Sequence, residues 1–302
     1  MRHLVSISDL NRDEIIYLLD LADKLKEERR KGIFRDYLKS RSLAMIFELP
    51  STRTRVSFEV AMCEAGGHAL YLNWNDLQLG RGEAIKDTAK VMSRYVHAVM
   101  MRVRKHETVV EFANHSEIPV INGLSNLEHP CQILADLQTI RERKGLDAVV
   151  AWVGDGNNVC NSLILAASIL GFELRVATPE GYEPDKQIVE MALSENSRIK
   201  LMHDPVEAVR EADVVYTDVW ASMGQESERE ERLRVFRPYQ VNLPLLSNAD
   251  EEAIVLHCLP AHRGEEITDE VMDGRQSAVF DQAENRLHAQ KALLIWLLGV
   301  EV

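Results

Sequence analysis

The sequence predicts an α/β protein with two doubly wound parallel sheets. Short apolar runs of strand length, such as residues 43–47 and 149–153, alternate with segments of helical periodicity. This alternation occurs in two series, separated by a long helical segment at residues 130–144. A chain of 302 residues is long enough for two hydrophobic cores. We therefore expect two domains joined by long helices, residues 1–132 and 133–283, with a C-terminal helix, about 284–302, that returns to the first domain.

The composition describes an acidic globular protein. Apolar residues make up 46% of the chain, charged residues 27%, and the net charge is −13. This charge argues against nucleic acid or an anionic membrane as a partner. The longest apolar runs, residues 163–170 and 292–300, are too short to span a bilayer. Because Met1-Arg2-His3 leads into a helical pattern rather than a signal-peptide core, we expect a cytoplasmic protein.

The cysteines are few and far apart. Cys63, Cys131, Cys160 and Cys258 form no Cys-x-x-Cys pair, so their spacing predicts neither a zinc site nor a disulfide framework. We interpret Cys63 and Cys160 as small buried apolar residues and Cys131 as part of the packing. We expect no metal ion and no organic cofactor.

The first half of the chain begins with a charged amphipathic helix. Ser8 or Asp9 is the predicted N-cap, and the helix continues through Lys31. Residues 43–47 have the pattern of a strand buried on both faces, which Pro50 closes. Beyond the next helix, strands are predicted at residues 68–72, 98–103 and 119–122, and helices at 84–95, 108–114 and 130–144.

The turn after the first strand has the chemistry of an anion site. Ser51 stands at the N-cap position of a helix that carries its apolar face on Val56, Val60 and Cys63. The N–H groups at such a helix start point outward, together with the positive end of the helix dipole. Arginines and hydroxyls surround them in the run Ser51-Thr52-Arg53-Thr54-Arg55. The turn therefore suits a phosphate, or a ligand that carries one.

The second half repeats the alternation. Arg102 in the first half and Asp218 and His257 in the second come at strand ends, where charged and polar groups gather around ligands in parallel sheets. His129 and Gln132, three residues apart at the start of a helix, can face one ligand. Strands are predicted at residues 149–153, 173–177, 199–203, 214–217 and 254–258, and helices at 158–170, 185–193 and about 283–298.

Gly154-Asp155-Gly156 raises a rival function. It follows a strand and opens a helix, as the dinucleotide-binding fingerprint Gly-x-Gly-x-x-Gly does. Val159 occupies the place of the third glycine, and the acidic Glu180 lies beyond Pro179. A nucleotide-dependent dehydrogenase is therefore a remote alternative.

Five motifs together resemble one family. The run Ser51–Arg55 is similar to the carbamoyl-phosphate signature of the aspartate and ornithine carbamoyltransferases. The resemblance covers nearly the whole chain, with all motifs in order. The other motifs are His129-Pro130-Cys131-Gln132, Asp218-Val219-Trp220-Ala221-Ser222-Met223-Gly224, His257-Cys258-Leu259-Pro260 and Glu284-Asn285-Arg286.

This resemblance implies a role for each candidate residue. His129 and Arg286 meet the carbonyl oxygen of the carbamoyl group, Gln132 meets its amide, and the backbone carbonyls of Cys258 and Leu259 accept from its NH2. The implied catalytic residues are Arg53, Arg102, His129, Asp218, Cys258 and Arg286. The implied phosphate ligands are Ser51, Thr52, Arg53, Thr54, Arg102 and, from a neighbouring subunit, Gln78.

The motif at residues 218–224 resembles the ornithine loop of the ornithine-specific branch. It implies that Asp218 binds the α-amino group of ornithine, with Asn158, Ser222 and Met223 as further contacts. The charged run at residues 225–232 then lets the loop close over the ligand. The implied reaction is direct attack of the side-chain amine of ornithine on carbamoyl phosphate, through a tetrahedral intermediate, giving citrulline and phosphate.

Several alternatives stay open within this resemblance. Putrescine and N-acetylornithine are rival substrates. A non-catalytic regulator is a further alternative, although it is expected to lack Arg53, His129 or Cys258, which this chain keeps. A role in arginine synthesis and a role in arginine degradation are both open. The loop at residues 73–82 is too polar for its own domain's core, and its resemblance to the family's loop implies that Gln78 completes the site of the next subunit in a homotrimer or a multiple of one.

Overall fold

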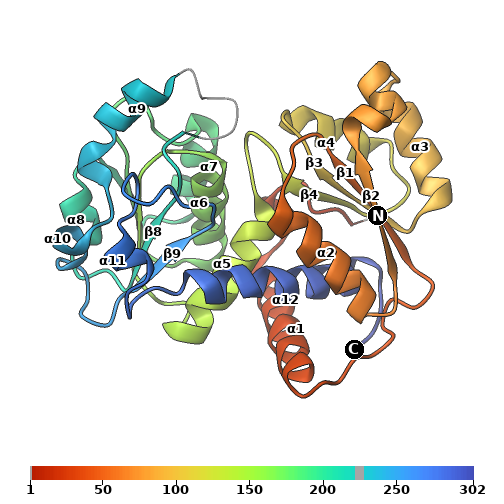
Figure 1. The fold of residues 1–302 in the computed structure, drawn as a ribbon, viewed down its shortest axis with the longest axis horizontal. Helices are drawn as coiled ribbons and strands as arrows, with labels where there is room; N and C mark the ends of the chain where they lie inside the picture. The colour runs from red at the N-terminus through yellow and green to blue at the C-terminus, as the bar shows by residue number, and fades with distance from the viewer. Residues whose placement is uncertain (1, 222–227) are drawn as a thin grey trace. The chain divides into compact units, whose positions relative to one another are not determined.

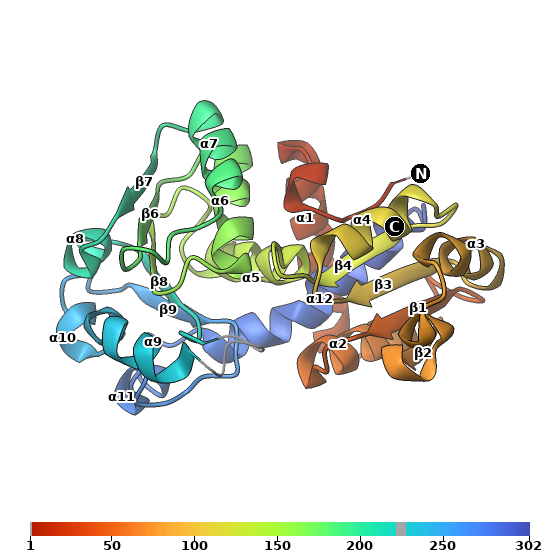
Figure 2. The same cartoon turned by 90° about the horizontal axis from the view of Figure 1, so that it is seen from above.

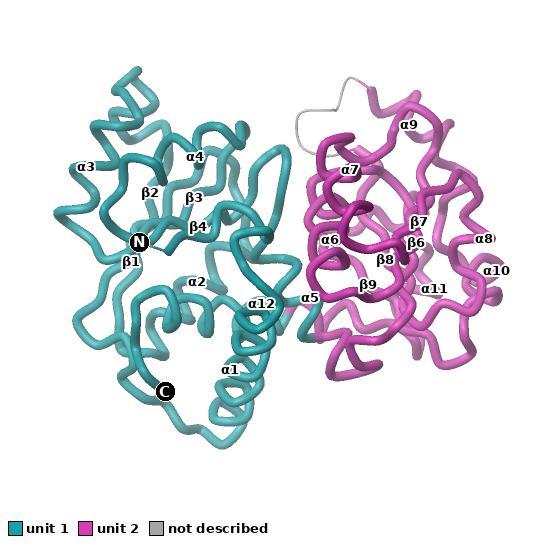
Figure 3. The backbone as a smooth tube through the Cα atoms, turned by 180° about the vertical axis from the view of Figure 1, so that it is seen from behind, with its two compact units in different colours: residues 1–138, 284–302 teal, residues 139–283 magenta. Residues whose placement is uncertain are grey.

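The computed structural model describes residues 2–221 and 228–302. The chain divides into two compact units, shown in different colours in Figure 3. Unit 1 contains Met1–Gln138 and Glu284–Val302, and unit 2 contains Thr139–Ala283. The division falls after Gln138, whereas the sequence placed it after Gln132. Two helices, α5 (Pro130–Arg143) and α12 (Val279–Leu297), carry the chain from one unit to the other.

Unit 1 is built on a four-stranded parallel sheet with the strand order β2-β1-β3-β4. Its helices are α1 (Arg12–Arg30), α2 (Thr52–Glu64), α3 (Ile85–Tyr95) and α4 (His106–Asn114), with the C-terminal part of α12 (Figure 1). Its strands are β1 (Ser42–Phe47), β2 (His68–Asn73), β3 (Ala98–Arg102) and β4 (Val120–Leu124).

Both faces of the β1 strand are buried. Ala44 and Ile46 pack in one cluster with Ala89 of α3 and Phe112 of α4. The alternate residues of a strand point to the opposite face, which explains the unbroken apolar run of β1.

Unit 2 has a five-stranded parallel sheet with the strand order β7-β6-β5-β8-β9. Helices α8 (Pro205–Val209), α10 (Leu243–Leu246) and α11 (Asp269–Met272) pack in one core cluster with β5, β8 and β9. Figure 2 shows α6 (Asn158–Leu170) and α7 (Lys186–Glu195) on the opposite side of this sheet. The strands are β5 (Val150–Val153), β6 (Leu174–Ala177), β7 (Ile199–Met202), β8 (Val214–Thr217) and β9 (Ile254–His257).

The two sheets confirm the predicted fold class and strand assignment. The sequence missed α8, α9 (Arg229–Val235), α10 and α11, which are too short for an apolar periodicity to be recognised. Helix α12 begins at Val279, earlier than the predicted start near Ala283. Among the described residues, no helix combines the length and the apolar character that a membrane span needs.

The predicted cap of α1 is wrong. Asn11 is the N-cap, because its side chain accepts from the N–H of Glu14 and the Glu14 carboxylate accepts from the N–H of Asn11. Ser8 and Asp9 belong instead to a preceding 3-10 turn, Ile7–Asp9, that Ser6 caps.

The predicted apolar face of α2 is also wrong. Val56 is 50% exposed and Cys63 is exposed, whereas Phe58, Ala61 and Met62 are buried. Both sets have helical spacing, so periodicity alone could not show which one faces the core. The interpretation of Cys63 as a buried residue is therefore incorrect, while Cys160 and Cys131 are buried as expected.

The loop after β2 packs better in its own unit than its polarity suggested. It forms two 3-10 turns, Trp74–Asp76 and Gln78–Arg81, and Leu79 is buried in the unit 1 core. Leu79 anchors the loop, and the neighbouring Gln78 side chain remains exposed.

In each unit the order of the strands reverses beside the strand that appears first in the chain. In unit 1 the reversal lies between β1 and β3, where Phe47 and Arg102 are register partners. In unit 2 it lies between β5 and β8. Doubly wound sheets bind ligands beyond the strand ends at such switch points. The residues that follow β1, β3, β5 and β8 are therefore candidates for a functional site.

Candidate functional site

The turn between β1 and α2 forms the expected capped helix start. Ser51 Oγ accepts from the N–H of Thr54 at 3.2 Å and donates to Thr54 Oγ1 at 3.2 Å. These bonds fix the first turn of α2, whose remaining N–H groups and positive dipole end point out of the helix. Thr54 is buried, Arg53 is half-buried and Thr52 is exposed. The geometry suits the oxygen atoms of a phosphate group.

Arg55, the second arginine of this motif, does not join the turn. Its guanidinium lies 3.9 Å from the ring centroid of Tyr71 and pairs with Glu59. Its side chain is 46% exposed in that ion pair. Arg53 is therefore the arginine of this run that remains associated with the anion site.

Arg102 lies beside this turn, at the end of β3. The residue is only 8% exposed, and its backbone carbonyl accepts from the N–H of Glu48 at 2.9 Å. Burial of a guanidinium is costly unless an anion or a set of hydrogen bonds compensates it. Its place next to Phe47 at the switch point agrees with a phosphate-binding role.

His129 is surrounded by positive charge. It is buried immediately before α5, and its carbonyl accepts from the N–H groups of Gln132 and Ile133. Burial, followed by the charges of Arg286, Arg102 and Arg53, holds the pKa of His129 well below its usual value. The imidazole is therefore neutral at pH 7 and can donate a hydrogen bond through one nitrogen without adding charge.

Arg286 on α12 completes this group in unit 1. Its Nη1 donates to Gln132 Oε1 at 2.6 Å, and its Nη2 donates to Thr54 Oγ1 at 3.2 Å. Gln132 also donates to Asp136 Oδ1 at 2.8 Å, so both ends of its amide have protein partners. The structure thus brings Arg53, Thr54, Arg102, His129, Gln132 and Arg286 together within one unit.

Two residues of this network were not recognised from the sequence. Arg286 Nε donates to Gln290 Oε1, and Gln290 Nε2 donates to Ser57 Oγ. Gln290 follows Arg286 by four residues on a helix, which is the spacing of neighbours on one face. That spacing could have signalled the contact.

In unit 2, the carboxylate of Asp218 is held after β8. Oδ1 accepts from the thiol of Cys258 at 2.9 Å and from the N–H of Val219 at 2.8 Å. Oδ2 accepts from Asn157 Nδ2 at 2.7 Å, and the same Asn157 side chain caps α6. Asn157, which was not predicted from the sequence, therefore holds Asp218, while the predicted Asn158 follows it at the helix start.

His257 supports the backbone after β9. Its Nδ1 accepts from the N–H of Leu259 at 2.9 Å, so Nε2 carries the proton that is donated to Glu266 Oε1 at 3.0 Å. Leu259 has a φ of 60°, a left-handed conformation that is unfavourable for a branched side chain. The His257–Glu266 pair stabilises this backbone, and Glu266 was not predicted.

Arg232 of α9 supports the segment that follows β8 and begins at Asp218. Its guanidinium donates to the carbonyl of Trp220 at 2.8 Å and lies 3.2 Å from Asp155 Oδ1. Burial raises the pKa of Asp155 to about 6, although Arg232 opposes this shift. The acidic loop after β5 and the segment after β8 are therefore joined by one buried arginine.

The remaining predicted residues fall in two classes. Ser222 and Met223 lie outside the described residues, as do residues 225–227 of the run 225–232 that was expected to let the loop close over a ligand. The last part of that run belongs to α9. Gln78 is exposed, at the start of a 3-10 turn.

Position 156 requires glycine because the chain's own backbone packs closely against it, and no bound dinucleotide is needed to explain the residue. A Cβ at this position would lie 2.3 Å from Glu183 C and from Pro184 N. The N–H of Gly156 donates to the carbonyl of Tyr182 at 2.9 Å. The chain's own backbone therefore occupies the space into which a pyrophosphate would approach in a dinucleotide site.

Among the residues of unit 2 that the structure describes, two groups of side chains could each place three ligand atoms around a metal ion. They are Asp218, His257 and Cys258, and His262, Glu265 and Glu266. In the first group these atoms already bond to one another or to neighbouring groups, as described above. In the second, Glu265 pairs with Arg229, and Glu266 Oε1 accepts from the N–H of His262 at 2.5 Å.

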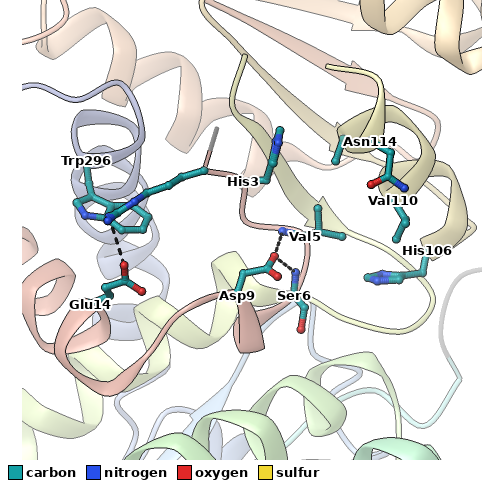
Figure 4. Close-up of a pocket in the computed structure, with 11 residues that line it drawn as sticks. His3, Val5, Ser6, Asp9, Glu14, His106, Val110, Asn114 and Trp296 are labelled. Atoms are coloured by element: carbon teal, nitrogen blue, oxygen red, sulfur yellow. Dashed lines mark hydrogen bonds and ion pairs between the residues drawn. The ribbon is translucent and has the colours of Figure 1, made fainter. Parts of the chain in front are cut away.

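A separate pocket of about 600 Å³ lies in unit 1 near the N-terminus (Figure 4). Arg2 stacks on Trp296 and pairs with Glu14, while Asp9 accepts from the N–H groups of Val5 and Ser6. These polar groups hold the N-terminal segment in place. None of the predicted site residues is among the described residues that line this pocket.

Comparison with known proteins relates both units to one family. Residues 2–142 match the carbamoyl-phosphate-binding domain of the aspartate/ornithine carbamoyltransferases, and residues 147–297 match their aspartate/ornithine-binding domain. The chain is 65% identical to an ornithine carbamoyltransferase of Archaeoglobus fulgidus, over 100% of this chain and 99% of that protein.

Solved structures agree with this relationship. An ornithine carbamoyltransferase from Pyrococcus furiosus is 54% identical, with a TM-score of 0.96 over 99% of this chain and 98% of that one. Another, from Thermus thermophilus, is 46% identical, with a TM-score of 0.89 over 99% of both chains. The chain belongs to the aspartate/ornithine carbamoyltransferase family.

Proposed function

We propose that this protein is an ornithine carbamoyltransferase, which transfers the carbamoyl group of carbamoyl phosphate to the side-chain amine of L-ornithine. The observation that carries the proposal is the group of arginines around a neutral, buried His129 at the switch point of unit 1. The relatives described above, which are named ornithine carbamoyltransferase, support the same assignment.

In this proposal, unit 1 binds carbamoyl phosphate. The α2 turn with Ser51, Thr52 and Arg53 holds the phosphate together with Arg102, and neutral His129 and Arg286 meet the carbonyl oxygen. When the amine attacks, that oxygen becomes an oxyanion, and donors arranged beforehand around it supply much of the rate enhancement. Thr54 bonds Arg286 and so links the phosphate turn to the oxyanion donors.

Unit 2 binds ornithine in this proposal. The Asp218 carboxylate attracts the α-amino group, and Asn158, Ser222 and Met223 are further contacts. The reacting amine must lose its proton, which at pH 7 costs roughly 4–5 kcal/mol for a group with a pKa near that of lysine. Cys258 orients the amine, the carbonyls of Cys258 and Leu259 accept from the carbamoyl NH2, and the departing phosphate takes the proton.

A nucleotide-dependent dehydrogenase is not supported. Val159 occupies the position of the third glycine in the dinucleotide-binding fingerprint, and the backbone of residues 182–184 fills the space beside Gly156. A non-catalytic regulator is also disfavoured, because Arg53, His129 and Cys258 are all present.

We further propose a homotrimer, or a multiple of one, with shared active sites. Exposed apolar side chains on α2 and on the edge strand β2, Val56 and Leu70, support a contact between copies of the chain. The exposed Gln78 is then available to the phosphate of a neighbouring site. We also propose a cytoplasmic location, which is compatible with four cysteines that form no disulfide with one another.

The assignment is tested by citrulline formation from carbamoyl phosphate with ornithine, putrescine and N-acetylornithine in parallel. We expect kcat/KM to be highest for ornithine. Putrescine lacks the carboxylate, and acetylation removes the charge that Asp218 attracts. A higher kcat/KM for putrescine or N-acetylornithine would mean that the substrate is that amine and not ornithine.

A further inference from the structure

Gln290 connects the guanidinium of Arg286 to the turn that begins α2. Both residues lie on one face of α12 and are buried, at 1% and 3% exposure. Arg286 Nε donates to Gln290 Oε1 at 2.9 Å, and Gln290 Nε2 donates to Ser57 Oγ at 2.6 Å. Ser57 Oγ donates to the carbonyl of Arg53 at 2.6 Å. A continuous chain of hydrogen bonds therefore runs from Arg286 to the backbone of the phosphate turn.

The chemistry of this chain requires an amide at position 290. Arginine has no acceptor, so Gln290 must present its carbonyl oxygen to Arg286 and its NH2 group to Ser57. The single proton of Ser57 goes to the Arg53 carbonyl. A carboxylate at position 290 has no proton to donate to Ser57, and it also adds a negative charge beside Arg286. A glutamate side chain is therefore similar in shape to glutamine but cannot make the same hydrogen bonds.

The named partners of Arg286 share a second property. Gln290, Gln132 and Thr54 are all neutral, so they orient the guanidinium without neutralising it. These three partners hold the guanidinium by hydrogen bonds and add no negative charge of their own beside it.

We propose that Gln290 is a positioning residue, which holds Arg286 toward the carbonyl oxygen of carbamoyl phosphate and ties it to the phosphate turn through Ser57. This inference rests on the function proposed above. It assigns Gln290 no contact with either substrate. Its effect on the reaction passes through the orientation of Arg286, which the link to Ser57 helps to fix.

A double-mutant cycle tests this dependence. We expect Gln290→Ala to lower kcat by about tenfold, less than the loss of a direct oxyanion donor, with the ornithine KM nearly unchanged. In an Arg286→Ala background the same substitution has no further effect. Gln290→Glu, which keeps the size of the side chain, lowers kcat at least as much. An equal loss from Gln290→Ala in both backgrounds would overturn the proposal.

His288→Ala is the matched control. His288 is buried on the same helix, and its ring donates to Glu284. We expect this variant to lose stability as Gln290→Ala does, while its kcat stays near the wild-type value. If both variants lower kcat by the same factor, Gln290 acts only through the stability of α12 and the proposal fails.

A binding measurement separates this proposal from the function on which it rests. Calorimetry with phosphonoacetamide, which carries both a phosphonate and a carbonyl, requires no ornithine. Gln290→Ala should weaken this probe but leave the affinity for inorganic phosphate unchanged. If that selective loss occurs in an enzyme that forms no citrulline, the positioning role stands and the ornithine assignment fails. Equal loss for both probes contradicts the positioning role.

Discussion

The thiol of Cys258 donates to the carboxylate of Asp218, with Sγ 2.9 Å from Oδ1. Because the hydrogen bond requires the proton, Cys258 is a thiol rather than a thiolate in this arrangement. A thiol is a poor nucleophile. The contact therefore supports Cys258 as an orienting group and direct transfer without a covalent intermediate.

Cys258→Ser should reduce activity without abolishing it. A serine hydroxyl also donates to Asp218, and the substitution leaves the backbone carbonyls in place. Because Asp218 serves ornithine in our proposal, the ornithine KM should rise more than the carbamoyl phosphate KM in steady-state assays. Cys63→Ser, at an exposed position, is the control and should change neither constant. Isolation of a carbamoyl thioester on Cys258 would show that the direct mechanism is wrong.

Asp155 should make unit 2 less stable as the pH rises. Its pKa is about 6 in the folded protein, against 3.8 for the ordinary carboxyl group. A raised folded pKa gives a stabilising contribution that is fully present below pH 3.8 and is lost as the pH rises through about 6. The shift corresponds to about 3 kcal/mol over the whole range.

The Asp155→Asn variant should lack this dependence, because an amide does not ionise and can still accept from Arg232. Native-state hydrogen exchange of the β5 amides, corrected for the intrinsic effect of pH, compares the two proteins. The stability of the variant relative to the wild type should increase from pH 5 toward pH 7. Parallel profiles would mean that Asp155 ionises normally in the folded unit.

Gln78 should act in a neighbouring subunit. If Gln78→Ala and Arg53→Ala are each nearly inactive, a functional site needs Arg53 from one chain and Gln78 from the next. Random mixing of equal amounts in a closed trimer should restore roughly a quarter of the sites. Refolding the two unfolded variants together produces such hybrids. Activity no higher than the mean of the separately refolded variants would place Gln78 in its own site or outside any site.

The strands were predictable because their signals are local. Short apolar runs bounded by proline, glycine and polar residues predict buried parallel strands, and all nine strands in the described part of the chain were recognised. Arg102 and Asp218 were selected because polar groups at the ends of parallel strands line ligand sites, and Arg53 because it stands at a helix start suited to an anion. The family resemblance added roles to His129 and Arg286 that spacing alone could not supply.

What the sequence could not show depends on contacts between distant segments. Ser57 and Gln290 are 233 residues apart, and no local pattern relates a serine in α2 to a glutamine in α12. The pairs Asn157–Asp218 and His257–Glu266 likewise become visible only when the sheet brings their strand ends together. The buried face of α2 was misjudged for the same reason, because burial depends on what packs against the helix.

These residues are proposed to transfer a carbamoyl group directly from carbamoyl phosphate to ornithine. The most direct measurement is a single-turnover reaction with carbonyl-¹³C-labelled carbamoyl phosphate and ornithine, followed by NMR, in the wild type and in Arg53→Ala. We predict that the wild type moves the label to citrulline while releasing one phosphate per citrulline, and that Arg53→Ala does so far more slowly. Label that stays in carbamoyl phosphate with the wild type, or that becomes bound to the protein, would contradict the account.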